Sequence, residues 1–219
     1  EGQKMQRLDD LVFTYLNTIK ILRPKVAILE NVKGLISGNS KVYAKEIFNE
    51  FKSIGYKVKV FLLNSATMGF PQMRERVFFI GVRDDIYKRE LKLNFNDKII
   101  PFKKISDNGD VKENLWPCTV KYWKDVIPGK SISTIHPKGN LFNYVKVDPN
   151  KPCNTVTHRM RLMHYKIKRK INFNEVILAS SFPKDYNFGK VDTNFIMGMS
   201  VPPLMIAKIA EQISKQIFN

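Results

Sequence analysis

Two uninterrupted apolar runs, each bordered by charged residues, constrain the fold of this chain most strongly. The first run, residues 26–29, leads directly into Glu30 and Asn31, and the second, residues 77–82, follows directly after the sequence Arg-Glu-Arg. Apolar runs of this kind predict strands that are covered on both faces, as is typical of α/β folds. Because α/β sheets bind ligands beyond the carboxyl ends of their strands, Glu30 lies where a functional site is expected.

Helical and strand patterns alternate over the first 83 residues. A helix is predicted to start at the acidic pair 9–10 and to end at Pro24, and a second helix covers residues 41–54 with Gly55 as its stop. Strands are expected over residues 25–29, 56–63 and 77–82. No strand precedes the first helix, so the pattern predicts part of an open sheet, with an exposed strand edge as a pairing surface.

The middle of the chain, about residues 85–150, has no such regularity. It is rich in Lys, Asn, Asp, Pro and Gly, and we expect a small, loop-rich region of irregular β structure. Its aromatic residues Trp116, Tyr122 and Trp123 could stack on bases or fill a small core. A core position is the stronger expectation for at least two of the three.

Regular structure returns near the carboxyl end. Asn172 and Glu175 have the spacing of a capping box, which predicts a helix through Ser180. Pro202 and Pro203 can occupy the first turn of a last helix. We expect this end to pack back on the first domain.

Charge is the strongest compositional signal. The sequence has 37 Lys and Arg residues against 20 Asp and Glu residues, which gives a net charge of +17. Such an excess favours a nucleic-acid partner, although a lysine-rich surface from a compositionally biased genome is the alternative. The run of basic residues over 158–170 could track phosphates through Arg159, Arg161, Lys166 and Lys168, or it could be a solvated face.

The sequence gives no sign of a membrane, a metal or a disulfide framework. No apolar run approaches the roughly 20 residues that span a bilayer, and the first residues lack a signal peptide's apolar region. The two cysteines, Cys118 and Cys153, form neither a disulfide framework nor a zinc motif. We therefore expect no metal and a reducing, cytoplasmic location.

Three charged residues are candidates for chemistry on their own. Glu30 could be a proton donor at a strand end, or simply a cap or an ion-pair partner of Arg74 or Arg76. The two arginines are two positions apart, so in an extended segment both would point to the same face as a forked double cation. The alternative is an arginine–carboxylate network at the sheet edge.

Four segments together resemble a known family. ILRPKVAILENVKGL, LLNSATMGFPQMRERVFFIGVRDD, FPKDYNF and GMSVPP, in that order, resemble the carboxyl-terminal half of a DNA cytosine-5 methyltransferase of restriction–modification type. The resemblance covers nearly the whole chain except about residues 86–145. It implies the carboxyl-terminal half of the Rossmann-like α/β sheet of an S-adenosylmethionine-dependent methyltransferase, with a small irregular β-rich target recognition domain.

The resemblance also implies a domain plan. Residues 1–84 would form a partial catalytic domain, residues 85–170 a target recognition domain, and residues 171–219 helices that pack back on the catalytic domain. Double-stranded DNA would be the partner. An RNA-modifying relative is a weaker alternative, because the sizeable irregular insert favours DNA.

Residue roles follow from the same resemblance. Glu30 would hydrogen-bond the ring nitrogen of a flipped cytosine and help to protonate it. Arg74 and Arg76 would support the catalytic loop and contact the target nucleotide. Ser200 would touch S-adenosylmethionine, while Met199 stands where the family has an asparagine, which puts the polar contacts of this loop in doubt.

The chemistry that the resemblance implies needs a cysteine thiolate that attacks carbon 6 of cytosine. In the family this cysteine belongs to a Pro-Cys-Gln loop, and a Gly-rich turn holds the methyl donor. Neither is found here, since Cys118 and Cys153 follow prolines but precede Thr and Asn. We therefore expect the chain to be inactive alone and to need an amino-terminal methyltransferase segment. It could be a split subunit, a fragment or a degenerate gene product, or a non-catalytic DNA-binding module.

Overall fold

The computed structural model describes residues 9–107 and 114–218 and divides the chain into two compact units. Unit 1 comprises Glu1–Leu63, Glu75–Leu93 and Glu211–Asn219, and unit 2 comprises Asn64–Arg74 and Asn94–Ala210. These bounds differ from the predicted boundaries at residues 84 and 170. The predicted domain roles remain a prediction.

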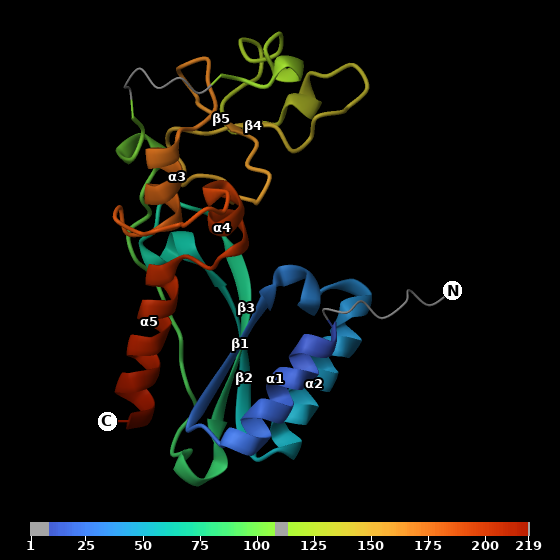
Figure 1. The fold of residues 1–219 in the computed structure, drawn as a ribbon, viewed down its shortest axis with the longest axis vertical. Helices are drawn as coiled ribbons and strands as arrows, with labels where there is room; N and C mark the ends of the chain where they lie inside the picture. Colours follow the sequence, from blue (N-terminus) through green and yellow to red (C-terminus); the bar gives the residue numbers. More distant parts are fainter. Residues whose placement is uncertain (1–8, 108–113, 219) are drawn as a thin grey trace. The chain divides into compact units, whose positions relative to one another are not determined.

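Unit 1 is built around a three-stranded sheet with the strand order β1-β3-β2. Its strands are β1 (Val26–Val32), β2 (Tyr56–Asn64) and β3 (Glu75–Arg83). β1 runs antiparallel to β3. Helices α1 (Asp9–Leu22) and α2 (Lys41–Ser53) lie side by side along this sheet (Figure 1). The predicted α/β class and the helix–strand–helix–strand–strand order are therefore confirmed.

Burial along the strands follows their place in the sheet. Residues 77–82 of the central strand β3 are all buried, as the apolar run predicted. In β1, Ala27 and Leu29 are buried, whereas Val26 and Ile28 are only partly covered. The expectation of a strand covered throughout is therefore wrong for residues 26–29, because β1 lies at the edge of the sheet.

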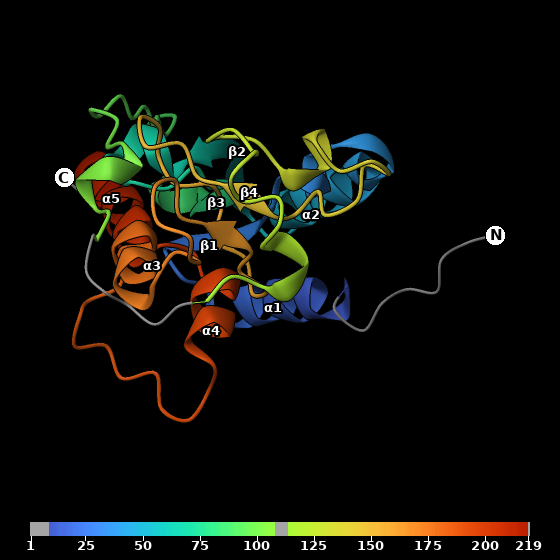
Figure 2. The same ribbon diagram turned by 90° about the horizontal axis from the view of Figure 1, so that it is seen from above.

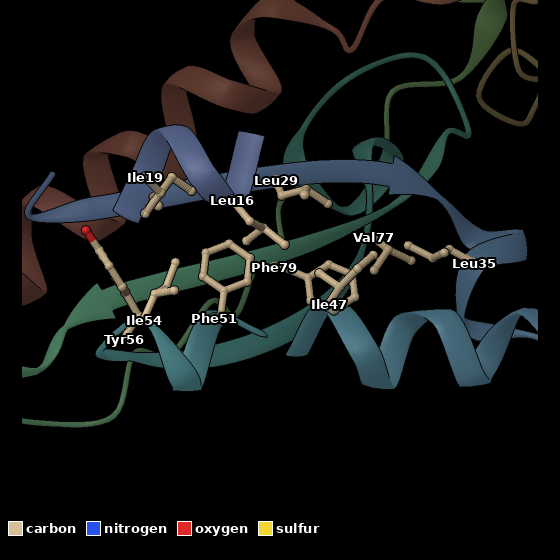
Figure 3. Packing of buried hydrophobic residues seen from close by; sticks show 11 residues of the cluster. Leu16, Ile19, Leu29, Leu35, Ile47, Phe51, Ile54, Tyr56, Val77 and Phe79 are labelled. Atoms are coloured by element: carbon tan, nitrogen blue, oxygen red, sulfur yellow. The ribbon is translucent and has the colours of Figure 1, made fainter. Parts of the chain in front are cut away.

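The core of unit 1 lies between the sheet and the two helices (Figure 3). Leu16 of α1 and Phe51 of α2 pack there against Phe79 of β3. Gly81 permits this contact, because a Cβ at that position would lie 2.9 Å from the Phe51 ring. Gly55 ends α2 with a φ of +86°, as predicted for a glycine stop.

Unit 2 is largely irregular. It contains the short parallel strands β4 (Val145–Lys146) and β5 (Leu162–Met163), and the helices α3 (Phe173–Ser180), α4 (Thr193–Met199) and α5 (Pro203–Ile213), of which the last continues into unit 1. A π-helical turn over Ser214–Phe218 follows α5. The connection from α3 to α4 runs out beyond both helices before it returns (Figure 2). The 3-10 segments of both units lie at Lys33–Ile36, Gly38–Ser40, Ser65–Met68, Asp84–Ile86, Phe102–Lys104, Pro117–Thr119 and Ile132–Thr134.

Two small cores hold unit 2 together. The larger core groups buried residues of α3, such as Val176, with Phe102, Val156 and Met197. In the smaller core, Trp116, Tyr122 and Trp123 are partly buried against Leu115, Val126, Ile132, Tyr144 and Met163. The core position predicted for these aromatic residues is confirmed. α3 begins with the predicted capping box, and α5 begins at the second of the two prolines.

No helix within the described residues is long and apolar enough to cross a membrane.

Candidate functional site

The carboxyl end of β1 carries an ion pair. Arg76 lies opposite Val32 in the antiparallel ladder, so its side chain reaches Glu30 on the neighbouring strand. The Nε of Arg76 lies 2.8 Å from Oε1 of Glu30, and the two side chains are 14% and 32% exposed. A partly shielded arginine therefore fixes the direction of a carboxylate that remains partly open to solvent.

Neighbouring polar residues stabilise the same end of the sheet. The side chain of Asn31 accepts a 2.8 Å hydrogen bond from the Val32 backbone N–H, and Lys33 forms a 3.0 Å ion pair with Glu75. The arginine–carboxylate network that we considered as an alternative for Arg76 is present.

Arg74 belongs to unit 2 and has a different environment from Arg76. Its side chain is 1% exposed, and its guanidinium donates to the carbonyls of Val156 (2.8 Å) and Gly198 (2.9 Å). The predicted forked double cation is therefore wrong. Buried carbonyls of unit 2 accept from the two terminal nitrogens of Arg74, whereas the partner of Arg76 is a carboxylate of unit 1.

The segment before Arg74 runs beside residues 153–156. Backbone bonds join Met73 N–H to the Cys153 carbonyl (2.7 Å) and Cys153 N–H to the Pro71 carbonyl (2.8 Å). The side chain of Gln72 accepts from Val156 N–H and donates to the Ala179 carbonyl. One buried amide therefore ties two distant segments to the residues that precede Arg74.

The predicted cofactor-contacting residues lie at the end of α4. Gly198 is buried so tightly that a Cβ would lie 2.1 Å from the His158 backbone nitrogen. Met199 is 62% exposed. Ser200 is partly buried, and its hydroxyl donates a 2.7 Å hydrogen bond to the Ile196 carbonyl. The Ser200 oxygen keeps lone pairs that can accept a hydrogen bond from a ligand, while the side chain of Met199 has no amide.

Two open clefts in unit 2 share three basic residues. The larger has a volume of about 880 Å³ and the other about 740 Å³. His158, Arg159 and Arg161 line both of them. The structure therefore brings two of the predicted DNA-binding arginines together, and Lys166 and Lys168 are exposed on the loop that follows β5.

Aromatic rings hold two of the cleft cations in place. The Arg161 guanidinium lies 4.9 Å from the centre of the Tyr144 ring, and the Lys170 ammonium lies 4.7 Å from that of Trp116. Such contacts orient a cation without neutralising it. Arg159 is exposed, and no carboxylate of the described residues pairs with it.

The two cysteines differ in their surroundings. Cys118 is exposed at a 3-10 turn, whereas Cys153 is fully buried. Burial raises the pKa of the Cys153 thiol far above its usual range. A buried thiol of this kind stays protonated and is a poor nucleophile. Within the described residues no group of three or more His, Cys, Asp or Glu side chains could hold a metal.

A buried ionic cluster in unit 2 was not predicted. Glu175 was expected only as a capping residue, but both its oxygens also bind the Arg169 guanidinium, at 2.8 and 3.0 Å. His164 lies beside them, 3.5 Å from Glu175, with 0% of its side chain exposed. Arg169 belongs to the basic run over residues 158–170. Nothing in the sequence of this run distinguishes Arg169, whose side chain is buried, from the cations that stay exposed.

The chain matches the family model described as C-5 cytosine-specific DNA methylase, over residues 1–151 and 87–215. Among curated proteins it is 30% identical to the type II methyltransferase M1.HphI of Haemophilus parahaemolyticus, and 26% identical to M.DdeI of Desulfomicrobium norvegicum. Each match covers 94% of this chain. The chain spans 60% of the length of the first relative and 66% of the second.

Solved structures share the fold. One is described as a DNA modification methyltransferase encoded within an E. coli prophage, with a TM-score of 0.75 and 16% identity over 96% of this chain and 75% of that one. Another is the Entamoeba histolytica methyltransferase EhMeth, with a TM-score of 0.67 and 17% identity over 96% of this chain and 69% of that one. At these identities the likeness concerns the fold.

Proposed function

Because the chain belongs to the C-5 cytosine-specific DNA methylase family, we propose that it is the carboxyl-terminal part of a DNA cytosine-5 methyltransferase of restriction–modification type. The complete enzyme transfers a methyl group from S-adenosylmethionine to carbon 5 of a cytosine flipped out of the duplex. The observation that carries this proposal is the 2.8 Å pair of Glu30 and Arg76 at the end of β1. It joins the two segments, ENV and QMRER, on which the resemblance depends.

Glu30 is the proposed acid group. It hydrogen-bonds the ring nitrogen of the cytosine and helps to protonate it, which prepares carbon 6 for attack. Arg76 fixes the direction of the Glu30 carboxyl group through a charge-assisted bond. Arg74 has a supporting role inside unit 2, where its guanidinium joins the carbonyls of Val156 and Gly198.

The nucleophile has to come from elsewhere. A thiolate must attack carbon 6, and the buried Cys153 is kept protonated. Cys118 is exposed in the irregular region and is not followed by Gln. We therefore assign the nucleophile to a Pro-Cys-Gln segment outside these 219 residues, on the same polypeptide or on a partner subunit.

Most of the methyl-donor site is assigned to that same segment. S-adenosylmethionine supplies the methyl group when bound. In this chain, the Ser200 hydroxyl oxygen is the group suited to accept a hydrogen bond from it. Met199, which is 62% exposed, has no side-chain amide to offer it.

Double-stranded DNA is the proposed partner of unit 2. The net charge of +17 attracts phosphates, and the two clefts present Arg159 and Arg161 on a common wall. Tyr144 orients Arg161, and the exposed Lys166 and Lys168 extend the basic surface. Unit 2 thus combines fixed and adaptable cations, which suits the separate tasks of phosphate binding and base reading.

Equilibrium binding to mixed-sequence duplex DNA tests this partner. We expect Arg159→Ala/Arg161→Ala to weaken binding at least about tenfold and to lower the slope of log Kd against log salt by about 2, since each lost phosphate contact removes about 0.9. Lys45→Ala/Lys52→Ala, with the same charge loss on exposed positions of α2, is the control. Equal losses in both variants would mean that net charge, rather than the clefts, binds DNA.

A second experiment tests the acid group. In the enzyme completed with a Pro-Cys-Gln segment, Glu30→Gln should lower methyl transfer by about 10²-fold or more, within the range of general acid–base effects. Glu46→Gln, an exposed glutamate on α2, should leave the rate unchanged. If the completed enzyme binds DNA but never methylates it, the chain is a non-catalytic binding module derived from such an enzyme.

A further inference from the structure

The loop at residues 164–170, which we call the basic loop, is held at its base by backbone bonds. His164 N–H donates to the Arg169 carbonyl at 3.0 Å. The Nδ1 atom of His164 accepts hydrogen bonds from the backbone N–H groups of Lys166 (3.1 Å) and Ile167 (2.9 Å). The loop is therefore a closed turn, from which Lys166 and Lys168 project into solvent.

A buried ion pair fixes the same loop to α3. Arg169 is 3% exposed and Glu175 is 0% exposed, and their two hydrogen bonds form a bidentate fork. The Glu175 carboxylate also accepts bonds from the backbone N–H groups of Asn172 (2.7 Å) and Asp107 (2.9 Å). The pair thus joins Arg169, at the base of the basic loop, to the start of α3 and to Asp107.

Stability alone is a weak reason for such a pair. Desolvation of two charges offsets most of their attraction, and apolar pairs of similar volume are often as stable. A bidentate fork, however, fixes distance and direction, which an apolar pair does not. The chemistry of the pair suits orientation of the loop better than it suits cohesion of the core.

We infer that the Arg169–Glu175 pair is a positioning device for DNA binding: it sets the basic loop so that Lys166 and Lys168 contact phosphates together. This inference rests on the proposed function, since it takes duplex DNA as the partner. The two lysines contact the phosphates directly, and the buried pair affects DNA binding only by positioning these lysines. Loss of the pair should therefore remove the same contacts as loss of the two lysines.

The test compares three variants of the full chain binding mixed-sequence duplex DNA over a range of salt concentrations. Arg169→Met/Glu175→Gln removes the pair with no change in net charge and keeps an acceptor for Asn172 N–H. Lys166→Ala/Lys168→Ala removes the exposed charges, and the third variant carries all four changes. We expect the pair variant and the lysine variant each to lower the salt slope by about 2. The fourfold variant should be no weaker than the lysine variant.

Two results would overturn the inference: a pair variant with the slope of the unmodified chain, or losses that multiply in the fourfold variant. Amide exchange monitors the fold, because the Lys166 and Ile167 N–H groups should lose protection in the pair variant while those of the α3 helix keep it. Loss of protection throughout α3 would show a merely structural role and would also overturn the inference. Failure of the unmodified chain to bind DNA would instead refute the proposed function.

Discussion

Arg74 and Gly198, which are 124 positions apart, are joined by a 2.9 Å hydrogen bond from the buried guanidinium to the glycine carbonyl. The same guanidinium binds the Val156 carbonyl. Gly198 in turn lies against the backbone of residues 157–158. Arg74 of the QMRER segment and Gly198 of the GMSVPP segment are thus connected inside unit 2.

Gly198→Ala should destabilise unit 2 strongly. The new Cβ would lie 2.1 Å from the His158 nitrogen, so the backbone itself must move. We expect a loss of at least about 3 kcal/mol, the upper range for overpacking, in urea-induced unfolding. Gly34→Ala is the control, because its Cβ meets only Val32, at 3.9 Å, and should cost about 1 kcal/mol or less. Similar stability of both variants would contradict the close packing at Gly198.

The two arginines of QMRER should differ in their effect on stability. Arg74→Met leaves two buried carbonyls without their donor, which should cost about 3 kcal/mol or more at about 1–3 kcal/mol for each group. Arg76→Met breaks one partly exposed ion pair and should cost about 1 kcal/mol or less. Thermal unfolding of both variants decides the matter. Equal losses would show that Arg74 is not a structural residue.

Sequence patterns predicted local structure here better than long-range contacts. The helices α1 and α2, the glycine stop at Gly55 and the capping box at Asn172 depend on neighbouring residues, so their signals lie in short windows. The inward turn of Arg169 and the burial of Arg74 depend on carbonyls and carboxylates supplied by distant segments. A spacing of two residues predicts that Arg74 and Arg76 share a face only if both belong to one continuous strand. β3 begins after Arg74, so that condition is not met.

The stability of unit 2 should fall in mild acid because of His164. Burial lowers the pKa of His164 from 6.5 to about 4, and the nearby Glu175 opposes this shift. Its Nδ1 accepts two backbone bonds, so the folded state requires the neutral ring. The unfolded chain binds a proton near pH 6.5. The contribution of the neutral His164 ring to the free energy of unfolding is therefore complete above pH 6.5. About 3 kcal/mol of it is lost as the pH falls to about 4.

Urea midpoints at pH 7.5 and pH 4.5 measure this contribution. His164→Gln should be less stable at pH 7.5 but should lose less stability on acidification than the unmodified chain. His158→Gln, at an exposed histidine, should behave like the unmodified chain. An identical acid response of the His164 variant and the unmodified chain would refute the role of this ring.

The edge of β1 should be protected when the proposed Cys-bearing segment binds. Arg83 N–H donates to the Lys25 carbonyl, so the backbone N–H groups of alternate β1 residues, including Leu29, point toward β3. The Ile28 N–H points away from β3. The Ile28 carbonyl accepts from the Tyr15 hydroxyl instead. In the chain alone, the Ile28 amide should exchange faster than that of Leu29. Addition of the segment should slow exchange at Ile28 selectively, and an unchanged Ile28 rate would exclude strand pairing at this edge.

Methyl transfer from labelled S-adenosylmethionine to mixed-sequence duplex DNA tests the central claim most directly. It is measured for the chain alone and for the chain mixed with a Pro-Cys-Gln segment from a related methyltransferase, such as the part of M1.HphI outside the matched 60%. We predict no transfer by the chain alone, and transfer by the mixture that Glu30→Ala abolishes. Transfer by the chain alone would contradict this prediction, because Cys118 or Cys153 would then have to be the nucleophile.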